Sequence, residues 1–271
     1  HPRSHQQHEP YLMRSIFAFM LALLPSGAFA CGPDTDCQVG DRIYRIAMPD
    51  SVQNFGALVF SHGYRGSARG VMRNGGLRRL ANEMGLALIA AHGEGGTWNL
   101  QGSPLNPQSD GSAEFAYFEA VLNDAQSRFG IDRTNVIATG FSAGGMMTWN
   151  LICHRSDLLR GGVPMSGTFW ENMPTSCETN PVSIVHIHGD NDPTVPLSGR
   201  PIGTTHQGDV PKALDMYARH GGFGNKIAQQ MGGLNCATRD NSEGQVLALC
   251  LFSGGHSFRL ENLRAGLELL K

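Results

Sequence analysis

The sequence predicts an α/β protein with a mostly parallel central sheet and helices on both faces. Short apolar runs alternate along the chain with longer segments that place apolar side chains at helical spacing, and this alternation is typical of strand–helix–strand units. The 271 residues suffice for one such domain or for two small ones. Hydrophobic residues make up 41% of the chain and charged residues 16%, which suits a globular protein with a sizeable core.

The predicted strands are short runs of mainly apolar residues bounded by turns. In order they are residues 42–48, 57–60, 86–91, 135–139, 163–166, 182–187 and 246–252. The first alternates enough between apolar and polar side chains for a strand. The second is a continuous apolar run that enters the turn Ser61-His62-Gly63, as a buried strand does.

The predicted helices carry apolar residues at helical spacing. They are residues 71–84, 113–129, 143–153, 210–218 and 258–270. Gly85 ends the first helix, and a polar loop rich in Gly, Pro and Asn precedes the second over residues 93–111. The interval between Ser166 and Val182 is too short for a large cap domain, so we expect an open site.

The beginning of the chain has the features of a secretory signal peptide. From Met13, the basic residue Arg14 precedes an apolar run over residues 16–24, and Ala28-Phe29-Ala30 closes the segment. This order predicts cleavage after Ala30. The run is too short to span a membrane, which requires about 20 residues.

We therefore expect three segments. Residues 1–12 resemble an upstream extension or vector sequence, residues 13–30 the signal peptide, and residues 31–271 a single folded domain that carries the candidate site. The protein would then be secreted or periplasmic. A lipid anchor on Cys31 is the alternative, but the position three residues before it holds Ala28 where leucine is usual.

The six cysteines all follow the predicted cleavage point. They are Cys31, Cys37, Cys153, Cys177, Cys236 and Cys250. An even count in an exported chain favours disulfides, although sequence alone does not choose among the possible pairings. We expect neighbours in the sequence to pair, 31 with 37, 153 with 177 and 236 with 250, because each pair lies on one local excursion of the chain.

Composition and spacing also exclude several kinds of partner. The formal net charge of −2 provides no basic surface for nucleic acid. There is no Cys-x-x-Cys motif, and His186 and His188 would share one face of a strand without further ligands nearby, so we expect no metal site. We expect no cofactor either, and the sequence does not indicate an oligomeric state.

Gly140-Phe141-Ser142-Ala143-Gly144 has the form of a nucleophile elbow, a tight strand-to-helix turn that exposes a serine hydroxyl. With 35 glycines in the chain, the pentapeptide alone could be an ordinary Gly-rich turn. The downstream order favours the elbow, because Asp190 and Asp192 follow it and His256 follows them. Nucleophile, acid, histidine is the order of α/β-hydrolases. Ser142 is therefore the candidate nucleophile.

His256 is the candidate base, because it follows the last predicted strand in the turn that begins at Gly254. Asp190 and Asp192 both follow the strand over residues 182–187, and either could orient the imidazole and stabilise its charged form. Asp190 directly follows a glycine turn and could instead bond neighbouring backbone amides.

Two backbone amides are candidates for stabilising the negative oxygen of a tetrahedral intermediate. One is the amide of Ala143, which follows the nucleophile, and the other lies in the loop after the strand that ends near Ser61. Tyr64 is our choice in that loop. We expect His62 to order the loop and to take no direct part in catalysis.

Three aromatic residues, Trp98, Phe169 and Trp170, lie in loops that follow predicted strands, at the rim where ligands bind to open α/β sheets. They could stack on a flat acyl group, hold an apolar polymer, or pack the loops against the core. The sequence leaves these alternatives open.

Several motifs combine into a known pattern. They are His62-Gly63-Tyr64, Trp98-Asn99, Gly140-Phe141-Ser142-Ala143-Gly144-Gly145-Met146-Met147, His186-Ile187-His188-Gly189-x-x-Asp192-x-x-Val195-Pro196 and Gly254-Gly255-His256. From about Arg42 to its end, the chain resembles the secreted polyhydroxybutyrate depolymerase and feruloyl esterase group of α/β-hydrolases. The His-Gly-x-x-Asp-x-x-Val-Pro spacing is the most specific motif, and the resemblance implies that Asp192 completes the triad. The cysteines after the elbow helix and before the acid strand also resemble the group and favour the pair Cys153–Cys177.

The sequence departs from the group in three respects. Ala113-Glu114 stands where the group often has two aspartates before the elbow strand, and Ala143 replaces a more frequent Asn or Gln. The second change leaves the backbone amide in place. Polymer-degrading members commonly carry a linker and a substrate-binding domain, which this sequence does not show, so soluble esters or short oligomers are the expected substrates.

We therefore expect a serine carboxylic-ester hydrolase that acts through an acyl-enzyme on feruloyl-type or other short soluble esters. A polyhydroxybutyrate oligomer depolymerase is the alternative within the same chemistry. A non-catalytic polymer- or carbohydrate-binding protein on a hydrolase scaffold is the alternative from another class. A peptidase is disfavoured, because the cap and propeller insertions of such enzymes are missing.

Overall fold

The computed structural model describes residues 2, 30–50 and 53–271. The predicted upstream segment and signal peptide lie outside these residues, apart from Pro2 and Ala30. Residues 31–271 form one compact unit. None of the helices in the described part of the chain combines the length and the apolar character needed to cross a bilayer.

A ten-stranded sheet runs through the domain in the order β1-β2-β4-β3-β5-β6-β7-β12-β11-β10. In chain order its strands are β1 (Cys37–Val39), β2 (Arg42–Ala47), β3 (Ala57–Ser61), β4 (Ala87–Ala91), β5 (Val136–Phe141), β6 (Gly161–Met165), β7 (Ser183–Gly189), β10 (Ile227–Met231), β11 (Leu234–Asp240) and β12 (Val246–Phe252). Neighbours from β4 to β12 are parallel, and the strands outside them pair antiparallel. The predicted mostly parallel sheet is confirmed.

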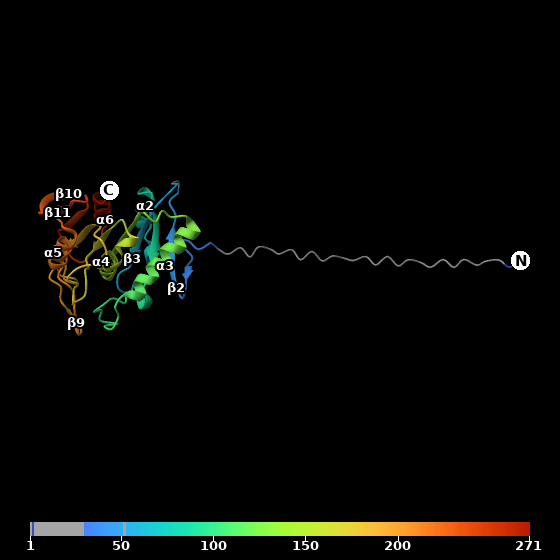
Figure 1. The fold of residues 1–271 in the computed structure, drawn as a ribbon, viewed down its shortest axis with the longest axis horizontal. Coiled ribbons are helices and arrows are strands. Elements are labelled where there is room, and N and C mark those ends of the chain that lie inside the picture. The colour runs from blue at the N-terminus through green and yellow to red at the C-terminus, as the bar shows by residue number, and fades with distance from the viewer. Residues whose placement is uncertain (1, 3–29, 51–52) are drawn as a thin grey trace. The chain divides into compact units, whose positions relative to one another are not determined.

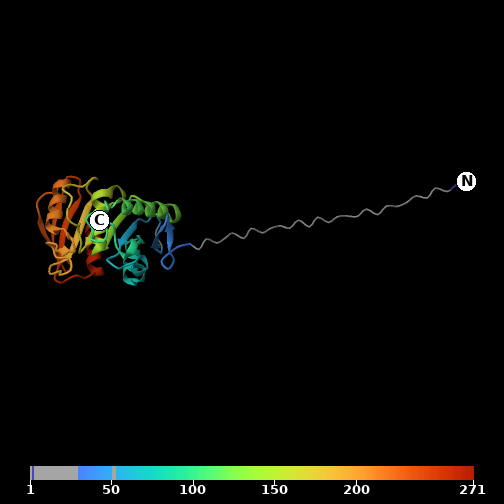
Figure 2. The ribbon, with the colours of Figure 1, turned by 90° about the horizontal axis from the view of Figure 1, so that it is seen from below.

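Helices cover both faces of this sheet (Figures 1 and 2). They are α1 (Ala68–Arg73), α2 (Gly75–Glu83), α3 (Ser112–Phe129), α4 (Ala143–Arg155), α5 (Val210–Gly221) and α6 (Leu260–Leu269). Alternate residues of one strand point to the two layers: Val59 packs in the cluster that holds side chains of α3 and α4, whereas Phe60 packs in the cluster that holds side chains of α1, α2 and α6. The α5 helix packs with α4 in a third cluster.

The register of the parallel strands brings the candidate residues to one edge of the sheet. Ser61 of β3 pairs with Gly140 of β5, and Gly189 of β7 pairs with Phe252 of β12. Through the intervening strands, the ends of these strands stay within three residues of one another. The loops that follow them carry the residues predicted for the site, as expected for a sheet whose ligands bind at the carboxyl ends of its strands.

Two parts of the fold differ from the sequence prediction. The helix expected over residues 71–84 is divided at Asn74, whose side chain accepts a hydrogen bond from the Leu77 amide at 3.0 Å and caps a second helix. The strands β1, β10 and β11 were not predicted. The side chains of β10 are almost all exposed, so this strand lacks the apolar alternation that marks a half-buried strand. A small hairpin of β8 (Pro201–Ile202) and β9 (Thr205–His206) was also not predicted.

Three disulfides join the cysteines, and they are the pairs expected from the sequence: Cys31–Cys37, Cys153–Cys177 and Cys236–Cys250. Cys236 and Cys250 lie directly opposite each other on β11 and β12. Disulfides of this kind are consistent with folding in an oxidising compartment.

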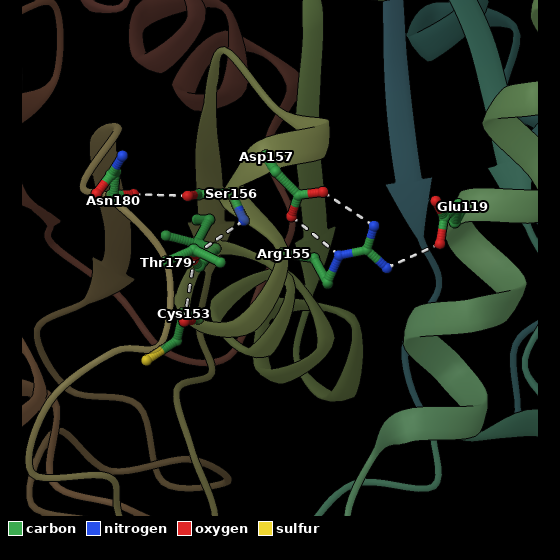
Figure 3. Close-up of polar contacts among 8 residues, drawn as sticks. Glu119, Cys153, Arg155, Ser156, Asp157, Thr179 and Asn180 are labelled. Carbon is green, nitrogen blue, oxygen red and sulfur yellow. Dashed lines mark hydrogen bonds and ion pairs between the residues drawn. The ribbon is translucent and has the colours of Figure 1, made fainter.

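The end of α4 that lies away from the sheet edge with the site is fixed to its surroundings on two sides (Figure 3). Arg155 donates to Asp157 with two nitrogens and to Glu119 of α3 with a third, all at 2.9–3.0 Å. The Arg155 guanidinium lowers the pKa of the Asp157 carboxyl below its ordinary value. The Ser156 amide donates to Thr179 Oγ1, and the Ser156 hydroxyl donates to the carbonyl of Asn180. The helix that begins after Ser142 is thus tied to α3 and to the segment before β7.

Candidate active site

Ser142 occupies a sharp turn between β5 and α4. Its φ of 59° and ψ of −120° lie in a region that residues with a Cβ rarely adopt, at a cost of about 1–3 kcal/mol. The turn closes because its neighbours lack side chains: a Cβ on Gly140 would overlap the Gly144 carbonyl, and a Cβ on Gly144 would overlap the Ser61 carbonyl. The local geometry is that of the predicted nucleophile elbow.

The structure places Asp192, and not Asp190, against His256. Asp192 Oδ2 lies 2.6 Å from His256 Nδ1, and the aspartate is 5% exposed. The other oxygen, Asp192 Oδ1, accepts hydrogen bonds from the amides of Thr194 and Val195, each at 2.9 Å. Both oxygens of this buried carboxylate are therefore hydrogen-bonded, as a buried charge requires.

Asp190 has a different environment. It is exposed, and its Oδ1 accepts a hydrogen bond from the Gly254 amide at 3.0 Å. The backbone adds two more bonds between these turns, from the Asp190 amide to the Phe252 carbonyl and from the Asn191 amide to the Gly254 carbonyl. Asp190 thus helps to hold the turn that carries His256 beside the turn that carries Asp192.

Phe141, the residue before Ser142, is in aromatic contact with His256. The rings of Phe141 and His256 lie 4.6 Å apart, so the residue before the serine packs against the candidate base. Within the described residues the Ser142 hydroxyl forms no hydrogen bond to His256. Hydrogen bonds of this kind are often long in unliganded hydrolases and shorten when substrate binds.

The candidate oxyanion donors lie around the same serine. Ala143 is the first residue of α4, so its N–H has no partner within the helix and lies at the positive end of the helix dipole. Tyr64 follows β3 in the loop predicted from the sequence. Both residues line one cavity together with Ser142.

A buried histidine holds the loop of Tyr64. His62 Nε2 accepts a hydrogen bond from the Gly93 amide at 2.9 Å, so the ring proton is on Nδ1 and is donated to the Gly63 carbonyl at 2.8 Å. Burial lowers the pKa of His62, which keeps the ring neutral in this position. These contacts agree with the expected role of His62 in ordering the loop.

The second support of this loop was not predicted. The Trp98 indole N–H donates to the His62 carbonyl at 2.9 Å, and the Asn99 amide next to it donates to Glu114 Oε1 at 3.0 Å. Glu114 is buried and its other oxygen lies 2.8 Å from Arg42 Nη1. Glu114 belongs to the Ala113-Glu114 pair, which stands where the group that the sequence resembles often has two aspartates. That position is the only signal in the sequence for its role.

A cavity of about 370 Å³ opens beside Ser142. Its wall is mainly apolar and includes Leu100, Leu105, Met146, Trp170, Val195 and Ile202. Arg200 is the charged residue among its described lining residues. Tyr64 and Leu105 at this cavity are 55% and 63% exposed, so apolar surface continues from the cavity toward solvent.

The three predicted aromatic residues divide into two groups. Trp98 and Trp170 line the cavity, although Trp98 is 2% exposed and its indole N–H is already hydrogen-bonded. Phe169 packs against Trp149 in the core, with ring centroids 5.5 Å apart. Trp170 is thus the best placed of the three to contact a ligand.

No metal-binding cluster of three or more His, Cys, Asp or Glu side chains is found among residues 30–50 and 53–271. His186 and His188 are hydrogen-bonded to each other at 2.9 Å, so the two nitrogens that face each other are already used.

Comparisons with known proteins relate the chain to esterases. Residues 100–204 match a family described as phospholipase/carboxylesterase. A putative esterase, NocK, from Nocardia uniformis subsp. tsuyamanensis is 27% identical over 224 residues, which cover 74% of this chain and 64% of that protein. Feruloyl esterase C from Emericella nidulans is 26% identical over 234 residues, which cover 81% of this chain and 77% of that protein.

Solved structures show the same fold. An acetyl xylan esterase from Aspergillus awamori superposes with a TM-score of 0.60 at 14% identity, over 84% of this chain and 91% of that one. A carboxylesterase from Mesorhizobium loti gives a TM-score of 0.60 at 18% identity, over 86% of this chain and 98% of that one. The predicted fold class is confirmed, and the sequence relatives support an esterase function.

Proposed function

We propose that this chain, an α/β-hydrolase related to known esterases, is a serine carboxylic-ester hydrolase that works through an acyl-enzyme. The observation that carries the proposal is the 2.6 Å contact between Asp192 Oδ2 and His256 Nδ1, at the sheet edge where Ser142 occupies its strained turn. The acid, the base and the nucleophile follow β7, β12 and β5, which belong to one run of parallel strands, and this supports their assembly at one edge of the sheet.

Each group has a defined task in this mechanism. The bond to Asp192 places the His256 proton on Nδ1, which leaves Nε2 free to take the proton of the Ser142 hydroxyl. The serine oxygen attacks the ester carbonyl, and the amides of Ala143 and Tyr64 stabilise the negative oxygen that forms. His256 then gives its proton to the departing alcohol. In the second half of the reaction, water attacks the acyl-enzyme with His256 as the base, and the carboxylic acid product is released.

The cavity supports an aryl or short apolar acyl group as the substrate. It is mainly apolar and is lined in part by Trp170, on which a flat ring can stack. Relatives named feruloyl esterase C favour the feruloyl class. The exposed apolar side chains of Tyr64 and Leu105 at the same cavity favour a second candidate, hydrolysis of hydroxybutyrate oligomers that extend beyond the cavity.

The three disulfides support action outside the cytoplasm, with residues 31–271 as the catalytic domain. N-terminal sequencing of the protein recovered from its native host is the test. A first residue of Cys31 would support export and cleavage after Ala30, whereas recovery of the uncleaved chain inside the cell would contradict it.

Product release from a mixture of methyl ferulate and hydroxybutyrate trimer tests the reaction, with the Ser142→Ala variant as the control. The variant should lose about 10⁵–10⁶ in kcat, as for other residues that act as a unit. Ferulic acid released first would support the feruloyl class, and hydroxybutyrate released first the oligomer class. If Ser142 does not react with a fluorophosphonate probe, the chain is a non-catalytic scaffold and the proposal is wrong.

A further inference from the structure

A continuous series of hydrogen bonds leads from the core to the candidate acid. The Trp149 indole N–H on α4 donates to His186 Nδ1 at 2.9 Å. His186 Nε2 lies 2.9 Å from His188 Nδ1, and His188 Nε2 lies 2.7 Å from the Val195 carbonyl. The side chains of Trp149, His186 and His188 are fully buried. We call these three residues the buried relay.

The two ends of the buried relay determine where its protons lie. An indole N–H only donates, so His186 Nδ1 accepts and the proton of His186 is on Nε2. That proton is donated to His188 Nδ1, and the proton of His188 is therefore on Nε2. A carbonyl oxygen only accepts, and the Val195 carbonyl receives this last hydrogen bond. Each ring nitrogen thus has one partner and one role.

Both histidines of the buried relay are neutral in this arrangement. A second proton on either ring would occupy a nitrogen that already accepts a hydrogen bond. Burial lowers the pKa of His186 well below its ordinary value, and burial also lowers the pKa of His188. The ionisable groups that face His188 are His186 on its own strand, Asp192 on the following turn and His256 on the loop after β12. From α4, the neutral indole of Trp149 faces the pair.

The buried relay ends at the turn that holds the acid. The Val195 carbonyl accepts the hydrogen bond from the His188 Nε2–H, and the Val195 amide donates to Asp192 Oδ1. His188 Nε2 also lies 3.5 Å from Asp192 Oδ2, the oxygen that contacts His256. Val195, whose amide binds the Asp192 carboxylate, is thus itself held by a hydrogen bond from the uncharged His188 ring.

We propose that His186 and His188 are positioning residues that fix the Asp192 turn through an uncharged hydrogen-bonded pair. This inference rests on the proposed function. The pair holds Val195 and Asp192 at one place relative to His256. Because neither ring carries a charge, the negative charge of Asp192 remains available to the imidazolium that forms on His256 during the reaction.

Steady-state kinetics on His188→Phe and His188→Gln test the positioning role. His188→Phe removes both hydrogen bonds, and we expect a loss of about 10²-fold in kcat with KM changed by less than about 3-fold, since misplacing a catalytic group by about 1 Å has an effect of that size. Gln keeps one donor and one acceptor, so His188→Gln should recover much of the loss. Near-UV circular dichroism and Tm identify a variant that has not folded.

His220→Gln is the matched control, because His220 Nε2 also bonds a backbone carbonyl, that of Thr179 at 2.8 Å, but on α5. Its kcat should equal that of the parent enzyme. A folded His188→Phe variant with the kcat of this control would overturn the positioning role.

Nitrogen-15 NMR of the unsubstituted protein tests the protonation pattern independently of folding variants. Both rings should show a protonated Nε2 and an unprotonated Nδ1, with shifts unchanged from about pH 5 to 8. A cationic ring or a proton on Nδ1 would contradict the uncharged pair. If the parent enzyme hydrolyses no ester, the proposed function fails, whereas the NMR result still decides the state of the pair.

Discussion

On both sides of Ser142, a neutral histidine holds a backbone turn through hydrogen bonds, but the two histidines lie in different surroundings. On the oxyanion side, the neutral His62 bonds one carbonyl and one amide of the backbone, and on the acid side the neutral His188 bonds the Val195 carbonyl. His62 lies in a loop that a neighbouring loop supports through Trp98. His188 lies within a strand, and its support comes from the core helix α4 through His186. A neutral imidazole can therefore fix a backbone turn whether its support is a loop or the core.

The two sides differ in how deeply the residues around each histidine are buried. On the acid side, buried aromatic side chains pack against one another, as Trp149 does against Tyr217 of α5. Beside the oxyanion loop, Tyr64 is more than half exposed and the cavity opens to solvent. In the proposed mechanism, the acid side has to hold one geometry, whereas the oxyanion side must also admit a substrate.

The largest effect should come from the acid itself. Asp192→Asn should lower kcat by about 10⁴-fold, since the amide disfavours the imidazole tautomer that the reaction needs. Asp190→Asn is the matched comparison, because its Oδ1 can still accept the bond from the Gly254 amide. Steady-state kinetics should show less than about a 10-fold loss for it. Equal losses for the two variants would contradict the assignment of Asp192.

His62→Phe should remove the hydrogen bonds by which the neutral histidine holds the loop on the oxyanion side. The Gly93 amide loses its partner and the Gly63 carbonyl keeps only the bond from the Gly66 amide, so we expect the Tyr64 amide to shift with the loop. We expect a loss of about 10–10² in kcat, because the donor is displaced and not removed. A transition-state analogue should bind more weakly by a similar factor, whereas an unchanged affinity for the analogue would show that the loop does not depend on His62.

Glu114→Gln should mainly affect stability. Gln can still accept the bond from the Asn99 amide, but the change leaves the Arg42 guanidinium, whose side chain is 10% exposed, without its charged partner. Breaking a buried ion pair costs about 3–5 kcal/mol, to be measured as the free energy of unfolding in urea. Arg264→Gln, which breaks the exposed pair with Glu83, should cost less than about 1 kcal/mol. Similar values for the two would contradict the larger contribution expected of the Arg42–Glu114 ion pair.

Mild acid should lower the free energy of unfolding, through histidines on both sides of Ser142. Burial lowers the pKa values of His62, His92, His186 and His188 in the folded protein, so the unfolded chain takes up protons first as the pH falls below about 6.5. The stability present above that pH is then lost toward pH 5, by up to about 1.4 kcal/mol per pH unit for each ring. Urea unfolding at pH 5, 6, 7 and 8 measures this slope. A flat profile would show that the rings gain protons without unfolding.

Local signals were sufficient for much of the fold and for choosing the candidate nucleophile and base. The elbow around Ser142 lies in a short motif whose spacing reflects backbone geometry, so the sequence indicates it directly, whereas the choice of Asp192 over Asp190 came from the family resemblance. Asn74 broke the first predicted helix because a capping side chain competes with helical periodicity over a few residues. The strand β10 has no buried face and hence no pattern to detect.

Long-range contacts were beyond the sequence. Arg42 and Glu114 meet only after β2 and α3 have packed, and the series from Trp149 to Val195 joins a helix, a strand and a turn. The motif with His186 and His188 was visible, but the spacing of two histidines on one strand face does not reveal that they bond each other. The same limit applies to the three aromatic residues, of which Phe169 packs in the core.

The Cys153–Cys177 disulfide has a consequence for proteolysis. It links the end of the helix that follows Ser142 to the segment that leads through β7 to Asp192, and between the two cysteines the chain has exposed residues such as Asn172, Thr175 and Ser176. A protease that cuts there separates the polypeptide into a fragment with the nucleophile and a fragment with the acid and the base. The two fragments stay covalently joined, so a nicked molecule migrates as one band until a reductant is added.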